Sequence, residues 1–184
     1  MSSDYIQVDE STLPVIDNEK HRAVKGYIWA VRDAVCGDVY FHYDMGSRGG
    51  DTARKLIGGY RGTIQTDGYE VYEAYEGAPG KRMIGCWAHA RRKFVEALDE
   101  DKKHASEALV YIGKLYCIEK EMQEACLDHD AIRPLAIGRK NYLFCGNHDA
   151  AVRAAIVYSL FSSCKAHDVD VRSWLEDTLR RIPT

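Results

Sequence analysis

No apolar run in this 184-residue chain approaches the roughly 20 consecutive residues that a membrane-spanning helix needs. The opening residues, Met1-Ser2-Ser3-Asp4, have neither the basic nor the apolar region of a secretory signal peptide. Together these two absences predict a cytoplasmic protein.

Positive charge is not in excess either, since 25 Lys and Arg residues stand against 28 Asp and Glu residues and the net charge is −3. This balance excludes a protein that attracts nucleic acid over its whole surface, so nucleic-acid binding would have to use local patches. Two such patches are present, Arg91-Arg92-Lys93 and Arg133 with Arg139-Lys140. Each is either a phosphate-binding cluster or the solvated face of a helix.

The cysteines have no short repeating spacing of the kind that zinc sites or disulfide frameworks show. They stand at positions 36, 86, 117, 126, 145 and 164, and we expect buried thiols. Cys86 and His89 form half of a zinc ligand set, but no second pair has matching spacing, so we expect no zinc site here. His89 either orients a phosphate or packs against its own helix.

Alternating apolar and polar residues predict strands at 5–9, 27–31, 39–43, 62–67 and 82–86. Short helices are expected at 51–57 and 69–75, each ended by glycine. The order is βββαβαβ, which indicates an α/β fold with a mixed five-stranded sheet flanked by helices. This layout resembles the ribonuclease H-like fold.

The second half of the chain reads as helical, with helices expected at 88–98, 104–124, 150–164 and 171–181. We therefore divide the chain into a ribonuclease H-like core, residues 1–100, and a helical C-terminal part of the same domain, residues 101–184. Trp87 and Phe94 are expected in the core. So is an apolar stripe at three- and four-residue steps, namely Ala105, Ala108, Leu109, Ile112, Leu115, Tyr116 and Met122.

Two aspartates close predicted strands, Asp9 on the first and Asp67 on the fourth. These strands lie side by side in a ribonuclease H-like sheet, which would bring the two carboxylates together. Two anions held this close repel unless hard cations lie between them, and two such ions can drive phosphoryl transfer. The alternative is that both residues are turn or helix-cap residues.

Three longer motifs occur in order. They are Gln65-Thr66-Asp67-Gly68-Tyr69, the segment 85–94 (Gly-Cys-Trp-Ala-His-Ala-Arg-Arg-Lys-Phe) and the segment 132–144 (Ile-Arg-Pro-Leu-Ala-Ile-Gly-Arg-Lys-Asn-Tyr-Leu-Phe). With Val8-Asp9-Glu10-Ser11 near the start, they resemble the insertion-sequence-66 family of bacterial transposases. The resemblance runs from the first of these residues nearly to the C-terminus.

This resemblance implies a DDE-type transposase that cleaves DNA and transfers strands with an acidic triad and Mg²⁺ or Mn²⁺. Asp9 and Asp67 correspond to the first two metal ligands. Where the family has the third, a glutamate, this sequence has His129, and most of a helical insertion is missing ahead of it. Asp130 is our candidate for the third catalytic and metal-binding residue, and Asp128 is the alternative.

The resemblance also implies transposon ends and target DNA as partners, a homodimer, and association with the nucleoid when bound to DNA. The segments that recognise transposon ends in the family are not in this sequence, so we do not expect site-specific recognition. Arg48 lies in a glycine-rich loop and either approaches the DNA backbone or is a surface residue. The candidate DNA-binding residues are Arg48, His89, Arg91, Arg92, Lys93, Arg133, Arg139 and Lys140.

Two other hypotheses stay open. Since the family's glutamate is replaced by His129, the chain could be a folded but inactive remnant that binds DNA or an intact transposase. It could also be another ribonuclease H-like nuclease, which would cut DNA without strand transfer.

Overall fold

The computed structural model describes residues 3–123 and 146–181. Its strands are β1 (Tyr5–Asp17), β2 (Arg22–Asp33), β3 (Val39–Tyr43), β4 (Gly62–Thr66) and β5 (Lys81–Gly85). Its helices are α1 (Gly50–Ile57), α2 (Trp87–Glu96), α3 (Lys102–Gln123), α5 (His148–Ala166) and α6 (Val171–Arg181), with 3₁₀ helices η1 (Glu70–Tyr75) and η2 (Ala97–Asp99). Within these described residues, no helix is both long and apolar enough to cross a membrane.

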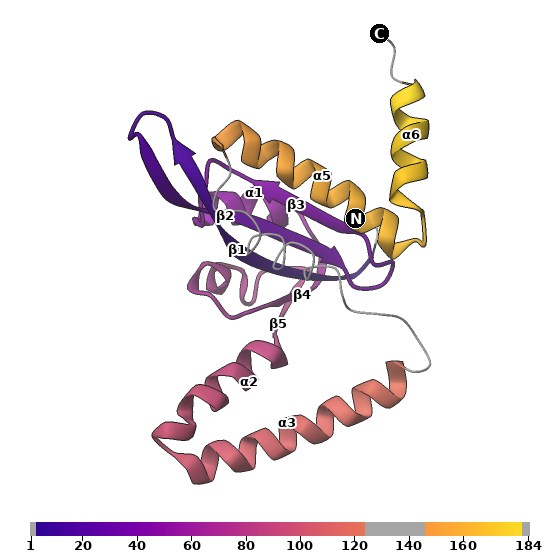
Figure 1. The fold of residues 1–184 in the computed structure, drawn as a ribbon. Helices are drawn as coiled ribbons and strands as arrows, with labels where there is room; N and C mark the ends of the chain where they lie inside the picture. The colour runs from indigo at the N-terminus through magenta and orange to yellow at the C-terminus, as the bar shows by residue number, and fades with distance from the viewer. Residues whose placement is uncertain (1–2, 124–145, 182–184) are drawn as a thin grey trace.

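The five strands form one mixed sheet in the order β3-β2-β1-β4-β5 (Figure 1). Strands β1, β2 and β3 form an antiparallel meander, whereas β4 is parallel to β1 and β5 is parallel to β4. Parallel pairs need crossover connections, and α1 and η1 lie in the two crossovers here. The prediction of a mixed five-stranded α/β sheet is confirmed, and the topology is consistent with a ribonuclease H-like fold.

The first strand is longer than predicted. We expected it to end at Asp9, but β1 continues to Asp17, so Asp9 lies inside the strand. The additional residues pair with β2 as far as Asp17 opposite Arg22, and they bury Leu13 and Val15. Polar residues in this stretch hid the alternation that marks a strand. The segment is nevertheless extended, because it pairs with β2 along its whole length.

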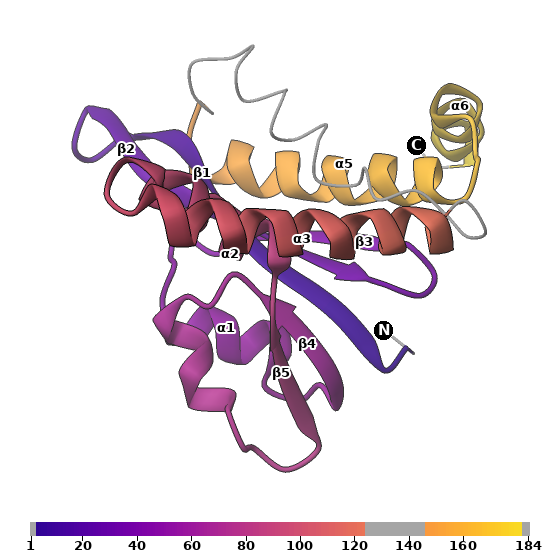
Figure 2. The same ribbon diagram turned by 90° about the horizontal axis from the view of Figure 1, so that it is seen from below.

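Apolar side chains cover both faces of the sheet, since successive strand residues point to opposite faces. On one face Phe41 lies in a buried cluster with Ala151 and Ala155 of α5. On the other face Trp29 packs in a cluster with Ile57 of α1 and Tyr72 of η1. Figure 2 shows α5 and α1 on opposite sides of the sheet.

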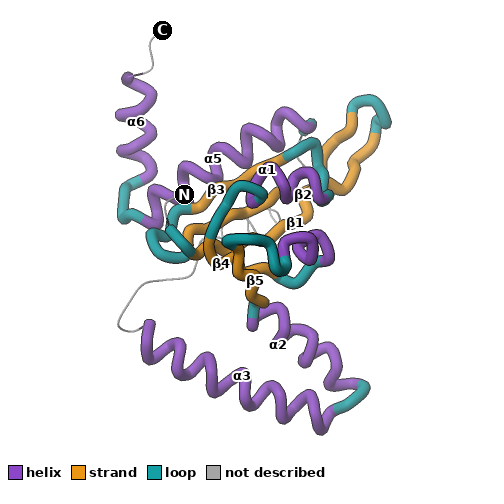
Figure 3. Tube along the Cα trace, turned by 180° about the vertical axis from the view of Figure 1, so that it is seen from behind, coloured by secondary structure: helices purple, strands orange, loops and turns teal. Residues whose placement is uncertain are grey.

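Helices α2 and α3 form a pair that extends away from the sheet (Figure 3). The prediction that Trp87 and Phe94 belong to the core is wrong, because they are 52% and 37% exposed. In the predicted stripe of α3, Ala105 and Ile112 are buried, whereas Leu115 is exposed. The helical periodicity was correct, but the two helices pack mainly on each other and no sheet covers their outer sides.

The cysteines also differ from expectation. Cys164 is buried, but Cys36 and Cys117 are exposed free thiols and Cys86 is half-buried. The sequence carries no signal for this difference, because exposure depends on which surfaces are covered in the assembled fold: Cys36 lies in the turn between β2 and β3, whereas Cys164 lies on α5.

Candidate functional site

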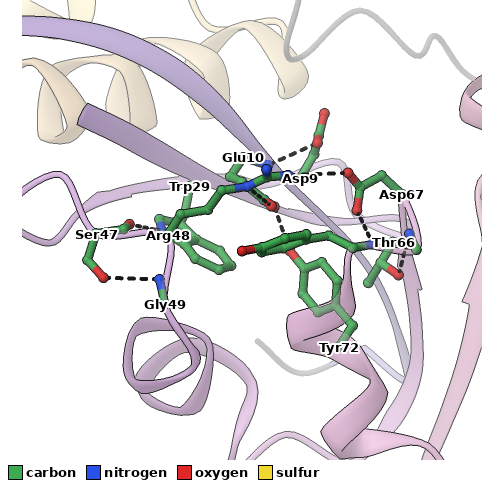
Figure 4. Close-up of polar contacts among 11 residues, drawn as sticks. Asp9, Glu10, Trp29, Ser47, Arg48, Gly49, Thr66, Asp67 and Tyr72 are labelled. Carbon is green, nitrogen blue, oxygen red and sulfur yellow. Dashed lines mark hydrogen bonds and ion pairs between the residues drawn. The ribbon is translucent and has the colours of Figure 1, made fainter. Parts of the chain in front are cut away.

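Asp9 and Asp67 lie next to each other at the carboxyl end of the β1–β4 pair. The last parallel pair in the register is Gln7 with Gln65; Asp9 follows Gln7 by two residues within β1, and Asp67 follows Gln65 by two residues, directly after the end of β4. Figure 4 shows their side chains in the same region, together with a buried network on the neighbouring loops. The structure thus brings together the first two predicted site residues.

The electrostatics of Asp9 support this proximity. Burial raises the pKa of Asp9 above its ordinary value of 3.8, and the negative charge of Asp67 raises it further. The positive charges of His89 and Arg92 and the backbone N–H of Glu10 act in the opposite direction without cancelling the rise. Asp9 therefore lies in a setting where its ionised form is disfavoured unless another cation approaches.

Asp67 is oriented by the turn that follows β4. Its Oδ1 accepts a hydrogen bond from the backbone N–H of Tyr69 at 2.9 Å. Gly68 lies between them at φ +83°, a conformation that side chains with a Cβ rarely adopt. The other carboxylate oxygen of Asp67, Oδ2, lies 3.7 Å from Nη2 of Arg48. Both carboxylate oxygens thus have a partner.

His89 lies in the first turn of α2, which begins directly after β5. Its charge is close enough to lower the pKa of Asp9, while its Nδ1 is buried without a hydrogen-bond partner within the described part of the chain. The structure therefore places His89 near Asp9, with one ring nitrogen buried and unpaired among the described residues.

Arg48 is not a free surface cation. Its Nε donates to Oε1 of Glu10 at 2.7 Å, and its guanidinium stacks on the Tyr69 ring with Cζ 3.7 Å from the centroid. The Tyr72 hydroxyl donates to the other oxygen of Glu10 at 2.8 Å. About one third of the Arg48 side chain stays exposed.

Sequence reasoning missed Glu10 and Tyr72. Glu10 was noted only as part of a motif, and Tyr72 only as part of a short helix. Alternation along β1 could have placed Glu10 on the face opposite Asp9. However, its partner Arg48 is 38 residues away, and nothing in the local sequence specifies that contact.

The basic cluster on α2 is exposed, as a binding surface would require. Arg91 and Arg92 face solvent, and Lys93 pairs with Glu96 on the same helix at 3.3 Å. The remaining predicted site residues lie outside the described residues, namely Asp130, Arg133, Arg139 and Lys140.

The described residues contain no group of three or more His, Cys, Asp or Glu side chains that could hold a metal ion. Asp9 and Asp67 still fit Mg²⁺, because this ion is commonly held by one or two carboxylates together with waters and substrate phosphates. Burial of Asp9 beside a second carboxylate also favours an added cation. The two carboxylates are thus compatible with a hard cation that takes its remaining ligands from elsewhere.

Comparison with known proteins gives consistent matches. The sequence model of a family described as "Transposase IS66 family" matches residues 1–131. Uncharacterized protein y4qI of Sinorhizobium fredii (strain NBRC 101917 / NGR234) is 28% identical over 130 residues, and y4hP of the same organism is 30% identical over 140 residues. Each match covers 62% of this chain and 24% of the relative, so the chain spans about a quarter of the length of these relatives.

Proposed function

This chain belongs to the IS66 family of transposases, and we propose that it carries the catalytic core of a DNA transposase, in which Asp9 and Asp67 bind Mg²⁺ or Mn²⁺. The observation that carries the proposal is the parallel register of β1 and β4, which sets the two carboxylates side by side. Reaction at DNA phosphodiesters, with cleavage followed by strand transfer, is the activity that this arrangement supports best.

A bound divalent ion would supply charge stabilisation for displacement at phosphorus. The chain's own residues supply orientation. The Tyr69 N–H orients one oxygen of Asp67. Asp9 is buried beside the negative charge of Asp67, so a cation that approached would stabilise its ionised form. Arg92 and His89 lie near Asp9 and are suited to contact a phosphate that approaches it.

We propose that the DNA backbone binds along α2 through Arg91, Arg92 and Lys93. Their exposure and the position of α2 directly after β5 support this. We also propose that the DNA backbone contacts three residues outside the described part, Arg133, Arg139 and Lys140. Asp130, also outside it, is proposed as the third metal ligand. A homodimer is proposed from the family resemblance alone.

An inactive remnant is the second candidate. The observation in its favour is His129 at the position where the family resemblance expects a glutamate. Such a protein would keep the fold and the basic cluster of α2 but would not cleave DNA.

Mn²⁺ titration by calorimetry separates the two candidates without requiring the DNA substrate. We expect the wild-type chain to bind Mn²⁺ and Asp67→Asn to lose this binding. Asp51→Asn, on the exposed face of α1, is the matched control and should bind like wild type. Equal binding by all three proteins would mean that Asp67 is not a ligand, and absence of binding in wild type would favour the remnant.

A further inference from the structure

Glu10 is a buried carboxylate that the proposed chemistry does not use. It follows Asp9 directly on β1, so its side chain points to the opposite face of the sheet. Its side chain is fully covered. A carboxylate in such a place is costly unless it is paired. Burial indeed raises the pKa of Glu10 above its ordinary value despite hydrogen bonds from Tyr72 and Arg48.

Arg48 lies between two carboxylates and is closer to one of them. Its Nε is 2.7 Å from Oε1 of Glu10, whereas its Nη2 is 3.7 Å from Oδ2 of Asp67. The short contact is a charge-assisted hydrogen bond, and the long one is an ion pair beyond hydrogen-bond distance. Arg48 therefore makes a hydrogen bond to Glu10 and only a longer ion pair to Asp67.

The loop that carries Arg48 is itself fixed. The indole N–H of Trp29, a fully buried residue, donates to the carbonyl of Ser47 at 2.9 Å. The Tyr69 ring supports the guanidinium from one side. Figure 4 shows Glu10, Arg48 and Tyr72 meeting on the side of β1 away from Asp9. Because the backbone next to Arg48 is held by Trp29 and one side of the guanidinium packs on Tyr69, Arg48 can change its carboxylate partner only by rotation of its side chain.

We propose that Glu10 is a positioning residue for Asp67, which anchors Arg48 so that Oδ2 of Asp67 stays available to a divalent cation. This inference rests on the proposed function of Asp67 as a metal ligand. Without Glu10, the planar guanidinium would pair with Asp67 through two parallel hydrogen bonds and compete with the metal.

Mn²⁺ calorimetry on a small set of variants tests this role. We expect Glu10→Gln to weaken Mn²⁺ binding by about 10- to 100-fold, the usual effect of losing an outer-shell partner. The double variant Glu10→Gln/Arg48→Gln should regain wild-type affinity, because the competing cation is gone. Glu70→Gln removes one charge from the exposed face of η1 and should bind like wild type.

Glu10→Asp separates position from charge and serves if Glu10→Gln does not fold. It keeps the negative charge but withdraws the carboxylate from Arg48, so a similar loss of affinity is expected. Wild-type affinity in Glu10→Asp or in Glu10→Gln would overturn the proposal. Equal loss in Glu10→Gln and the double variant would make Glu10 a ligand and also overturn it. If wild type itself binds no Mn²⁺, the proposed function fails first, which is a different result.

Discussion

At the residue scale, the charge of Asp9 is the feature that most affects both stability and metal binding. Burial and the neighbouring Asp67 raise its pKa, and His89 and Arg92 only partly offset them. A carboxyl group with a raised pKa in the folded state costs stability when ionised. This cost is what a bound cation would relieve.

We therefore predict that Asp9→Asn is more stable than wild type at neutral pH in the absence of divalent ions. Between the ordinary pKa of 3.8 and the raised folded value, Asp9 holds its proton more often in the folded chain than in the unfolded chain. The contribution of Asp9 to the free energy of unfolding therefore becomes more favourable as the pH falls through this window. The advantage of Asp9→Asn should shrink accordingly, as followed by thermal melts at several pH values.

Asp51→Asn, exposed on α1, is the control for this series. Its difference in stability from wild type should not depend on pH in this way. An advantage of Asp9→Asn that stayed constant across the window would mean that ionisation of Asp9 is not its source.

At the element scale, the contact of α5 with β3 explains how an edge strand is protected. β3 is the outermost strand on its side of the sheet, and such an edge exposes unpaired backbone groups. The hydroxyl of Ser159 accepts from the Phe41 N–H at 2.7 Å, and that of Ser163 approaches the Val39 N–H at 3.5 Å. α5 therefore covers the strand with hydrogen bonds as well as apolar contacts.

We predict that Ser159→Ala lowers the free energy of unfolding by about 1–3 kcal/mol, because the Phe41 N–H would remain buried without a partner. Urea denaturation measures this change. Ser173→Ala, exposed on α6, gains the same helix propensity without losing such a bond and should change stability little. Equal effects of the two substitutions would show that the hydroxyl of Ser159 is dispensable.

At the scale of the whole molecule, the net charge of −3 means that DNA binding would depend on where the cations lie. Arg91 and Arg92 of α2 are both exposed, and Arg92 lies close enough to Asp9 to affect its pKa. Helices α2 and α3 extend away from the sheet as a pair (Figure 1), so the exposed Arg91 and Arg92 lie on an element that projects from the core.

We predict that Arg91→Gln/Arg92→Gln weakens binding to duplex DNA similarly for all sequences. Each lost phosphate contact should make the negative slope of log K against log salt shallower by about 0.9. Fluorescence anisotropy over a range of salt concentrations measures this slope. Lys102→Gln/Lys103→Gln, at the exposed start of α3, removes the same charge and should leave the slope nearly unchanged. Matching slopes for both double variants would argue against a patch on α2.

The order of the elements was predictable because it follows from local patterns. Alternation and glycine-bounded segments predicted the five strands and the helices between them, and the resemblance of this order to the ribonuclease H-like fold predicted that the first and fourth strands are neighbours, as β1 and β4 are. The juxtaposition of Asp9 and Asp67 came from that same topology. The length of β1 was underestimated because its pairing with β2 compensates for a polar stretch.

By itself, the sequence determined the family and the order of the elements along the chain, including the strand that contains Asp9 and the strand that Asp67 follows, since backbone periodicity and short motifs are local properties. Only the tertiary structure decided that Arg48 pairs with Glu10, that Ser159 reaches a strand 118 residues away, and that Trp87 faces solvent. These contacts depend on how distant segments meet when the layers close. A side chain's partner is therefore fixed by the assembled fold rather than by its neighbours along the chain.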